Sequence, residues 1–213
     1  MPNYCNNRLI IIGTKTNIEK FLKDFCKDRD EFSMKGMIQK DDFQENNNIW
    51  KLRNWGVAND ISFCDSCEYI FNNIEQIEDN LYQVKIQYST EDNSNILFIK
   101  NMSKKYRDLK FNLYYFNNNL FFCGQSIYED NNKIKEEFYN LNSFEDSSDS
   151  IIHILDFAFN NLFLYIEDVD LKEYPFKVFE YFKSKTFDLN FDKLYEEYKS
   201  KNYLKDFKVE ERE

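Results

Sequence analysis

Apolar and polar positions alternate with two different periods near the start of the chain. Residues 8–12 form a compact β-branched run that Gly13 closes, which predicts a strand followed by a turn. Thr16 then offers a helix N-cap, and Glu19 stands three residues further on. The apolar positions that follow recur at helical spacing: Ile18, Phe21, Leu22 and Phe25. The first predicted unit is therefore a strand followed by a helix.

Further strands and a second helix follow up to residue 125. Residues 57–63 and 81–88 predict strands, and the second of these alternates well enough to be half-buried. Residues 96–105 predict a helix whose cationic end suits the negative pole of the helix dipole. Residues 109–116 and 120–123 predict a hairpin around Asn117, Asn118 and Asn119.

This order predicts the fold class of the first 125 residues. Two β-α-β halves on one antiparallel sheet make a ferredoxin-like α+β domain. We expect its two helices to cover one face, because the strands alternate and are not apolar throughout.

Residues 126–213 predict a second, mainly helical and acidic extension. We expect a short polar helix over 132–141 and an apolar helix over 151–166, with Ser147, Ser148 or Asp149 as its cap. Pro175 suits the first turn of another helix, and Asn190 can cap the last one. The domain boundaries expected from sequence are thus 1–125 and 126–213, with the helical subdomain packed on the open face of the sheet.

Composition indicates a folded and acidic protein. Hydrophobic residues make up 42% and aromatic residues 18%, a load that argues against disorder. The net charge of −10 disfavours bulk attraction to nucleic acid or to an anionic membrane. The charge is uneven: residues 1–144 hold 21 acidic and 18 basic side chains, and residues 145–213 hold 17 and 10.

The acidic residues just beyond 144 are candidate partner contacts. No Lys or Arg occurs over residues 144–171. Such a surface is typical of solvated helix faces, or of a patch that docks on a basic protein such as a nuclease effector. The candidate contacts are Asp146, Asp149, Glu167, Asp168 and Asp170. The last three could also hold a divalent cation, but the segment lacks the Gly and the closing Glu of an EF-hand loop.

We expect a cytoplasmic protein without a membrane segment. The start of the chain lacks the basic and apolar regions of a signal peptide. The most apolar stretch, 151–166, contains His153 and Asp156 and is too short and polar to span a bilayer. Five cysteines in a chain of this size are expected to be reduced and mostly buried.

Two cysteine motifs have several interpretations. Cys64-Asp65-Ser66-Cys67 is a single C-x-x-C, whereas a zinc site needs four ligands. It is expected to follow a strand, while a redox C-x-x-C stands at a helix N-terminus. Structural thiols are therefore favoured over metal or redox chemistry. Cys5 lacks a nearby base apart from the single His153, and we expect it to be a small buried residue that begins the sheet.

Aromatic residues of the predicted hairpin could stack on the bases of single-stranded RNA. They are Tyr114, Tyr115, Phe116, Phe121 and Phe122. RNA-binding sheets normally carry basic rims, and this chain is acidic. We therefore expect these side chains to build the core instead.

The N-terminal run Met1-Pro2-Asn3-Tyr4-Cys5-Asn6-Asn7-Arg8-Leu9, then Gly13, then Asn54-Trp55-Gly56-Val57, resembles the YubB-type ferredoxin-like family. Residues 102–124 fit the final helix and hairpin of that family, so the resemblance covers about residues 1–125. Two segments depart from it: Ala58-Asn59-Asp60 stands where the family usually has Lys-Trp-Asp, and Gln87-Tyr88-Ser89-Thr90 replaces its usual Thr-Ala-Trp-Ser-Pro-Pro.

The resemblance implies a phage or plasmid setting, because the family occurs largely in mobile elements. We therefore expect a non-enzymatic accessory protein that binds a host protein in the bacterial cytoplasm, as an inhibitor of a nucleic-acid-targeting (anti-CRISPR-like) defence. No cofactor, catalytic residue or metal ligand is assigned. Two alternatives stay open: a metal-binding protein or enzyme that uses Cys64 and Cys67, and a sheet that binds single-stranded RNA.

Overall fold

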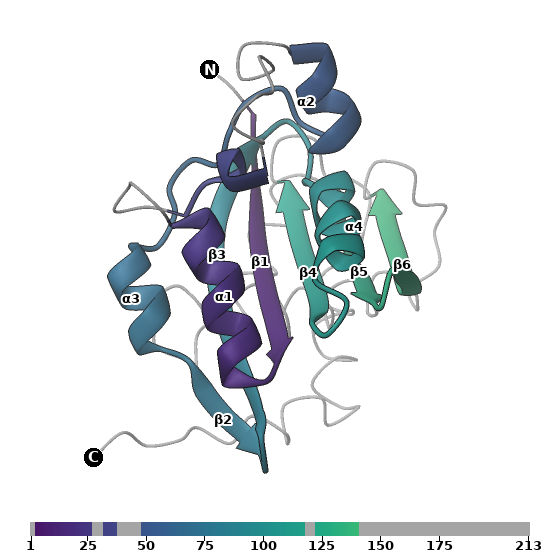
Figure 1. Cartoon of the computed structure of the whole chain (residues 1–213). Coiled ribbons are helices and arrows are strands. Elements are labelled where there is room, and N and C mark those ends of the chain that lie inside the picture. Colours follow the sequence, from purple (N-terminus) through teal and green to yellow (C-terminus); the bar gives the residue numbers. More distant parts are fainter. Residues whose placement is uncertain (1–2, 27–31, 38–47, 118–121, 141–213) are drawn as a thin grey trace, which may run out of the picture. The chain divides into compact units, whose positions relative to one another are not determined.

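The computed structural model describes residues 3–26, 32–37, 48–117 and 122–140. In these residues a six-stranded antiparallel sheet runs in the order β2-β3-β1-β4-β5-β6 (Figure 1). The strands are β1 Tyr4–Gly13, β2 Glu75–Glu78, β3 Leu81–Glu91, β4 Lys110–Asn117, β5 Phe122–Glu129 and β6 Asn132–Asn140. The helices are α1 Lys15–Phe25, the 3-10 turn η1 Met34–Met37, α2 Asn48–Asn54, α3 Cys67–Asn72 and α4 Ile96–Lys105.

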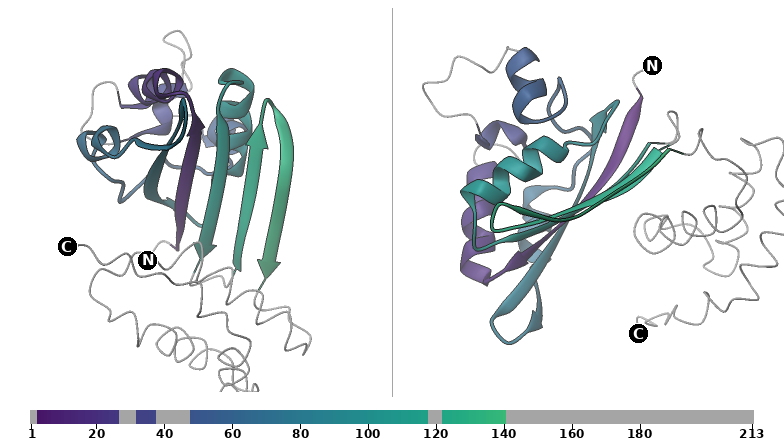
Figure 2. Two further views of the ribbon diagram at one scale, coloured as in Figure 1. Left: turned by 90° about the horizontal axis from the view of Figure 1, so that it is seen from below. Right: turned by 90° about the vertical axis from the view of Figure 1, so that its right-hand side faces the viewer.

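The elements β1-α1-β2-β3-α4-β4 form the ferredoxin-like arrangement that the sequence predicts. Each β-α-β crossover skips one strand, so β3 lies beside β1 and β1 lies between β3 and β4. Since such crossovers are right-handed, both helices fall on the same face of the sheet. Figure 2 shows α1 and α4 together on that face. The expected α+β class is thus confirmed for this part of the chain.

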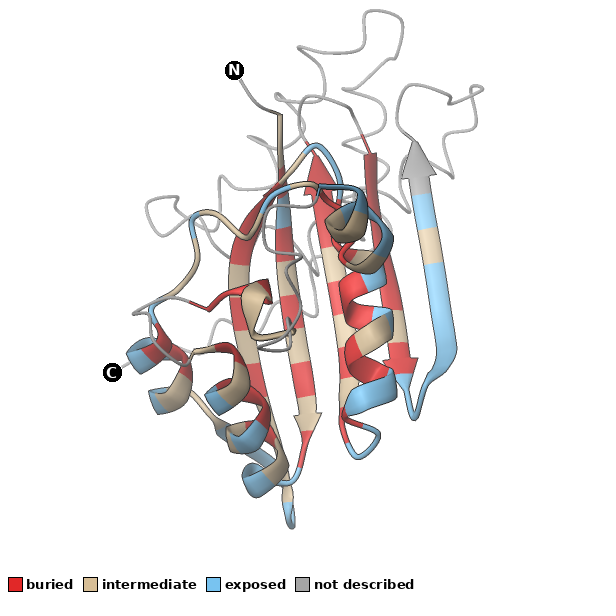
Figure 3. Ribbon diagram, turned by 45° about the horizontal axis from the view of Figure 1, so that its top comes forward, coloured by how far each residue is buried: buried red, intermediate tan, exposed pale blue. Residues whose placement is uncertain are grey.

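The core lies between the sheet and these two helices. Leu9 and Ile11 of β1 are fully buried, and their neighbours Ile10 and Ile12 are only partly buried, so the strand alternates as predicted. In Figure 3 the buried positions form bands across the neighbouring strands. The side chains of α1 that point into this core are the four predicted from helical spacing: Ile18, Phe21, Leu22 and Phe25.

The start of α1 differs from the predicted one. Thr14, not Thr16, is the N-cap, and its hydroxyl accepts a hydrogen bond from the backbone N–H of Asn17 at 3.3 Å. The helix begins two residues earlier because β1 ends at Gly13 and the chain turns directly into α1. Thr16 therefore lies inside the first turn.

Residues 57–63 are not the expected strand. Only Ser62 pairs with the sheet, through two backbone hydrogen bonds to Ser89 of 2.8 and 2.7 Å. The carboxylate of Asp60 accepts hydrogen bonds from the backbone N–H groups of Met34 and Ile61, at 2.9 and 2.8 Å. A side chain that bonds to nearby backbone in this way competes with a strand ladder. The edge strand is β2 instead.

Residues 132–140 form strand β6, so the polar helix expected over 132–141 is wrong. Asp130 and Asn131 both have positive φ angles, 44° and 64°, as a two-residue type I′ hairpin turn requires. The hairpin β5-β6 extends the sheet beyond residue 125, and the chain divides into compact units of residues 1–143 and 144–213. The helices expected over 151–166 and after Pro175 and Asn190, like their packing on the sheet, lie outside the described residues.

Within the described ranges no helix is long and apolar enough to cross a membrane.

Gly124 makes room for the extra hairpin. A Cβ atom at this position would overlap the Tyr115 hydroxyl and the Glu137 carbonyl oxygen. Tyr115 lies opposite Gly124 in the ladder and donates a hydrogen bond across it to the Glu137 carbonyl at 3.3 Å. Only glycine leaves space for this contact between β4 and β6.

Gly124→Ala is expected to lower the free energy of unfolding by about 1–3 kcal/mol, because the added methyl group displaces Tyr115 or β6. Urea unfolding followed by circular dichroism measures the change. Ser126→Ala in the same strand is the control, since the buried Ser126 hydroxyl has no hydrogen-bond partner among the described residues. That control should be as stable as the wild type or more so. Equal stability of Gly124→Ala and wild type would contradict the packing argument.

Candidate functional site

The five acidic candidate contacts lie outside the described residues. Asp146, Asp149, Glu167, Asp168 and Asp170 all fall within 141–213. Their role as partner contacts therefore stays a prediction. His153 also lies outside the described residues.

Cys26 and Cys67 form a disulfide, so the expectation that all thiols are reduced is wrong. Their Cα atoms lie 5.9 Å apart, within the usual range for such a bond. Cys26 caps the end of α1 and Cys67 is the first residue of α3, so the bond fastens the long insertion between α1 and β2 to the core. The two positions are 41 residues apart, and spacing alone did not predict their pairing.

The C-x-x-C segment also lies in a different local structure from the expected one. It does not follow a strand: Ser66 caps α3, and its hydroxyl accepts a hydrogen bond from the backbone N–H of Tyr69 at 3.2 Å. Because the sulfur of Cys67 is bonded to Cys26, it is not a thiolate that could pair with Cys64 on a metal. Within the described residues no three His, Cys, Asp or Glu side chains form a metal-binding group.

Cys5 and Cys123 are buried thiols in the sheet, and Cys5 lies at the start of β1, next to its first residue Tyr4, and is buried as predicted. Desolvation by burial raises the pKa of the Cys123 thiol to about 12. Burial likewise raises the pKa of Cys5 far above its usual range, and a hydrogen bond with the Phe116 backbone offsets this only partly. A thiol with so high a pKa is a poor nucleophile at neutral pH.

The hairpin aromatics divide between the two faces of the sheet. Tyr115 and Phe122 are buried on the helix-covered face, as the core prediction requires. Tyr114 and Phe116 point to the opposite face, which we call the far face, and Phe121 lies outside the described residues. The five side chains therefore do not form one stacking platform.

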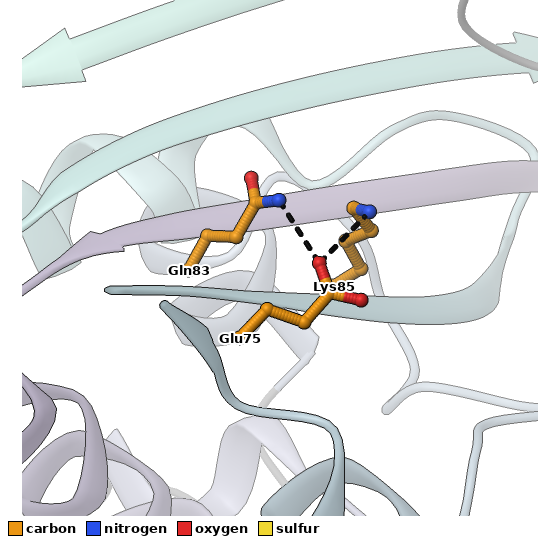
Figure 4. Close-up of polar contacts among 3 residues, drawn as sticks. All are labelled: Glu75, Gln83 and Lys85. Carbon is orange, nitrogen blue, oxygen red and sulfur yellow. Dashed lines mark hydrogen bonds and ion pairs between the residues drawn. The ribbon is translucent and has the colours of Figure 1, made fainter. Parts of the chain in front are cut away.

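Charged side chains on the far face form ion pairs, two of them across strands and one within β6. Lys85 of β3 lies 3.2 Å from the Glu75 carboxylate of β2, and the side-chain amide of Gln83 donates to the same carboxylate at 3.0 Å (Figure 4). Lys110 lies 3.6 Å from Glu129. On β6, Lys135 lies 3.0 Å from Glu137. The described lysines of this face thus each have a carboxylate partner.

These contacts perturb the ionisation of the groups involved. Partial desolvation alone would raise the pKa of Glu75, but the hydrogen bonds from Gln83 and Lys85, with the charges of Lys85 and Arg8, lower it. Burial raises the pKa of Tyr114, although the charges of Arg8 and Lys135 act in the opposite direction. The far face of the described strands therefore carries nearly balanced charges and lacks the basic rim of an RNA-binding sheet.

Phe63 is the most exposed large apolar side chain in the described residues, with 75% of its surface accessible. It also has a φ of +49°, a left-handed conformation that is rare for an aromatic residue. Its ring packs edge-on against Tyr4 of β1, with 5.2 Å between the ring centroids. We call Tyr4 and Phe63 the aromatic corner.

Hydrogen bonds on both sides hold Phe63 in this conformation. Before it, Ser62 pairs with Ser89 of β3. After it, the Asp65 carboxylate accepts a bond from the Gln87 backbone N–H at 3.0 Å, and the Asp65 backbone N–H donates to the Gln87 carbonyl at 3.2 Å. Burial raises the pKa of Asp65, and its hydrogen bond with the Gln87 backbone acts in the opposite direction. The turn that contains Phe63 is thus hydrogen-bonded on both sides to β3.

The aromatic corner was not predicted from the sequence. The strand expected over residues 57–63 ends at Phe63, where an aromatic residue would be half-buried. The available signal was the presence of Asp60 before and Asp65 after Phe63, because aspartates near a short apolar run favour turns over strands. The left-handed angle itself has no sequence signal at a phenylalanine.

The fold and the described surface define a ferredoxin-like domain with an extra hairpin and an exposed aromatic corner. A family model described as a ferredoxin-like domain in Api92-like protein matches residues 70–157. The match begins in α3, includes β2 to β6 and passes the expected boundary at residue 125. No curated protein and no solved structure matches the chain.

Reduction of the Cys26–Cys67 disulfide is expected to lower the free energy of unfolding of the unit 1–143 by about 4 kcal/mol, because the bond closes a long loop in the unfolded chain. Cys67→Ala should have the same effect without reductant. Tryptophan fluorescence during urea unfolding measures it, since the only two tryptophans, Trp50 and Trp55, lie in this unit. Cys64→Ala is the matched control and should unfold like the wild type. An unchanged midpoint on reduction would show that the bond does not constrain the fold.

A maleimide reagent near pH 8 is expected to modify Cys64 before Cys5 and Cys123. Cys64 is partly exposed, whereas the other two thiols are buried, and the pKa of Cys123 leaves only about one in 10⁴ molecules as thiolate at that pH. Mass spectrometry of peptides identifies the modified position, and labelling in urea is the reference. Prompt labelling of Cys123 in the folded protein would contradict its burial.

Proposed function

We propose that this protein is a non-enzymatic accessory protein of a phage or other mobile element that binds a host protein in the cytoplasm. The proposed partner has a basic surface and belongs to a nucleic-acid-targeting defence system, which the protein inhibits. The aromatic corner supplies an apolar anchor for the partner. The acidic residues Asp146, Asp149, Glu167, Asp168 and Asp170 supply electrostatic attraction.

The exposure of Phe63 carries this proposal. Leaving a phenylalanine in water instead of burying it forfeits roughly 2 kcal/mol. The left-handed backbone costs roughly 1–2 kcal/mol more. Strained and exposed residues held by a rigid surround are found at binding sites, where aromatic side chains contribute most of the affinity. A partner that covers Phe63 would recover the burial term.

Charge supports a protein partner over nucleic acid. The lysines described on the far face are neutralised by glutamates, and the whole chain carries −10. A negative surface attracts a basic protein, raises the rate of association and makes binding sensitive to salt. The family resemblance of residues 1–125 and its mobile-element setting support the biological context by analogy.

Capture from a bacterial lysate at about 0.05 M and about 0.5 M salt tests the proposal, with bound proteins identified by mass spectrometry. The wild-type chain is expected to retain a basic nucleic-acid-targeting protein at low salt and to lose most of it at high salt. Phe63→Gly should retain less than about a tenth as much, since losing a central aromatic costs 2 kcal/mol or more. It should fold at least as stably, because glycine tolerates the positive φ.

Two further variants separate the contributions. Replacing the five acidic residues by their amides should lower capture and remove most of its dependence on salt. Tyr69→Ser, at a side chain 53% exposed on α3, is the matched aromatic control and should capture normally. The proposal fails if the wild type retains no basic partner, or if Phe63→Gly and the amide variant both capture like the wild type.

A further inference from the structure

Strand β6 ends the sheet, and among the described strands its single neighbour is β5 (Figure 1). Most of its described residues are exposed (Figure 3). An edge strand presents backbone N–H and C=O groups that can pair with another strand. Charged side chains normally protect such an edge, and β6 carries four: Lys133, Lys135, Glu136 and Glu137.

The register of the hairpin assigns each β6 side chain to a face. Lys135 lies opposite Ile127 and Glu137 opposite Gln125, which places both on the far face. Glu136 lies opposite Ser126 and Phe138 opposite Gly124, which places both on the helix side. Ile134 is the extra residue of a bulge, directly before Lys135.

Two large apolar side chains of β6 are not buried by the fold. Ile134 is 57% and Phe138 is 59% exposed. Phe138 contacts Phe122 of β5 with its ring centroid 5.7 Å away, but α4 packs over β4 and β5. Charged residues alone would prevent unwanted pairing at this edge. Protection of the edge therefore does not explain why Ile134 and Phe138 are exposed on it.

We propose that β6 pairs antiparallel with β6 of a second copy of this chain, with Glu136 on the two-fold axis. Residues at equal distances before and after Glu136 then face each other across the two copies. Lys135 of each copy lies opposite Glu137 of the other, and Ile134 of each copy lies opposite Phe138 of the other. Opposite charges and apolar pairs directly across a ladder each contribute about 0.2–1 kcal/mol.

The charge pattern selects this register over its neighbours. In an antiparallel ladder, two side chains that lie directly opposite each other are on the same face of the sheet. The two-fold axis between two copies of β6 must therefore pass between a residue and the same residue of the second copy. Centring on Lys135 would place this lysine against itself and Ile134 against Glu136. Centring on Glu137 would place this glutamate against itself and Phe138 against Glu136. Only the register centred on Glu136 joins both the ion pairs and the apolar pairs.

One repulsive contact remains, between the two copies of Glu136. The Lys133 ammonium that pairs with Glu136 within the strand partly offsets it. The interface consists of only one short strand from each copy, so the dimer is weak and reversible.

Sedimentation equilibrium of the full chain, from roughly 0.01 to 1 mM, tests the pairing without any host partner. The wild type is expected to dimerise within this range. Lys135→Glu and Glu137→Lys should each weaken the dimer at least about fivefold, since like charges then face each other. The double reversal should restore it, and Glu136→Gln should strengthen it by a similar factor. Lys100→Glu, exposed on α4, is the control with the same change of net charge as Lys135→Glu.

Circular dichroism confirms that each variant is folded, which is expected because every substituted side chain is at least partly exposed. A monomer throughout the concentration range overturns the proposal. A dimer that none of the β6 variants alters, or that the double reversal fails to restore, also overturns it. Capture of a host protein is measured separately, so failure of the dimer leaves the proposed function intact.

Discussion

The structure depends on one register, that of β1 between β3 and β4. Every residue from Cys5 to Ile12 is paired on both sides, with Leu9 opposite Ile86 on one side and Leu113 on the other. Because side chains alternate with a period of two, a slip by one residue would turn Leu9 and Ile11 away from the helices. The same slip would bring Ile10 and the charge of Arg8 under α1. The buried alternation of β1 thus fixes both the core and the far face.

The hairpin β5-β6 extends this sheet by one further strand beyond β5, and the missing side chain of Gly124 makes room for it. Gly124 has no side chain, so Tyr115 crosses β5 and bonds to the backbone of β6. The backbone N–H of Asn131, in the turn between β5 and β6, donates to the Ser103 hydroxyl of α4 at 2.8 Å. The extra strand is therefore fastened at both its turn and its middle. Its outer edge is left with Ile134 and Phe138 exposed, which is the basis for proposing a second copy as its partner.

The long insertion between α1 and β2 is held by a few contacts that are distant in sequence. The Cys26–Cys67 disulfide joins the end of α1 to α3. Asp60 binds the turn η1, and Ser62 binds the edge of β3. These contacts fix the chain on either side of Phe63 and leave its ring in water. The exposure of that ring is a consequence of how the insertion is anchored, and the proposed binding function depends on it.

The sequence by itself determined the elements whose period is local. The alternation of β1 and β3, the helical spacing of α1 and α4 and the pairing of β4 with β5 were all predicted, and with them the ferredoxin-like core. The acidic candidates Asp146, Asp149, Glu167, Asp168 and Asp170 lie outside the described residues and stay predictions.

Tertiary structure decided what depends on distant partners. Residues 132–140 have the charges of a polar helix, yet a turn of two positive φ angles and a vacant edge of β5 made them a strand. Residues 57–63 are apolar enough for a strand, yet bonds from Asp60 and Asp65 left Phe63 in a turn. Cys67 found its partner 41 residues away because the folded chain brings the start of α3 beside the end of α1. Local periodicity records which face of an element is buried, but the neighbour that an element or a side chain meets is set by the folded chain.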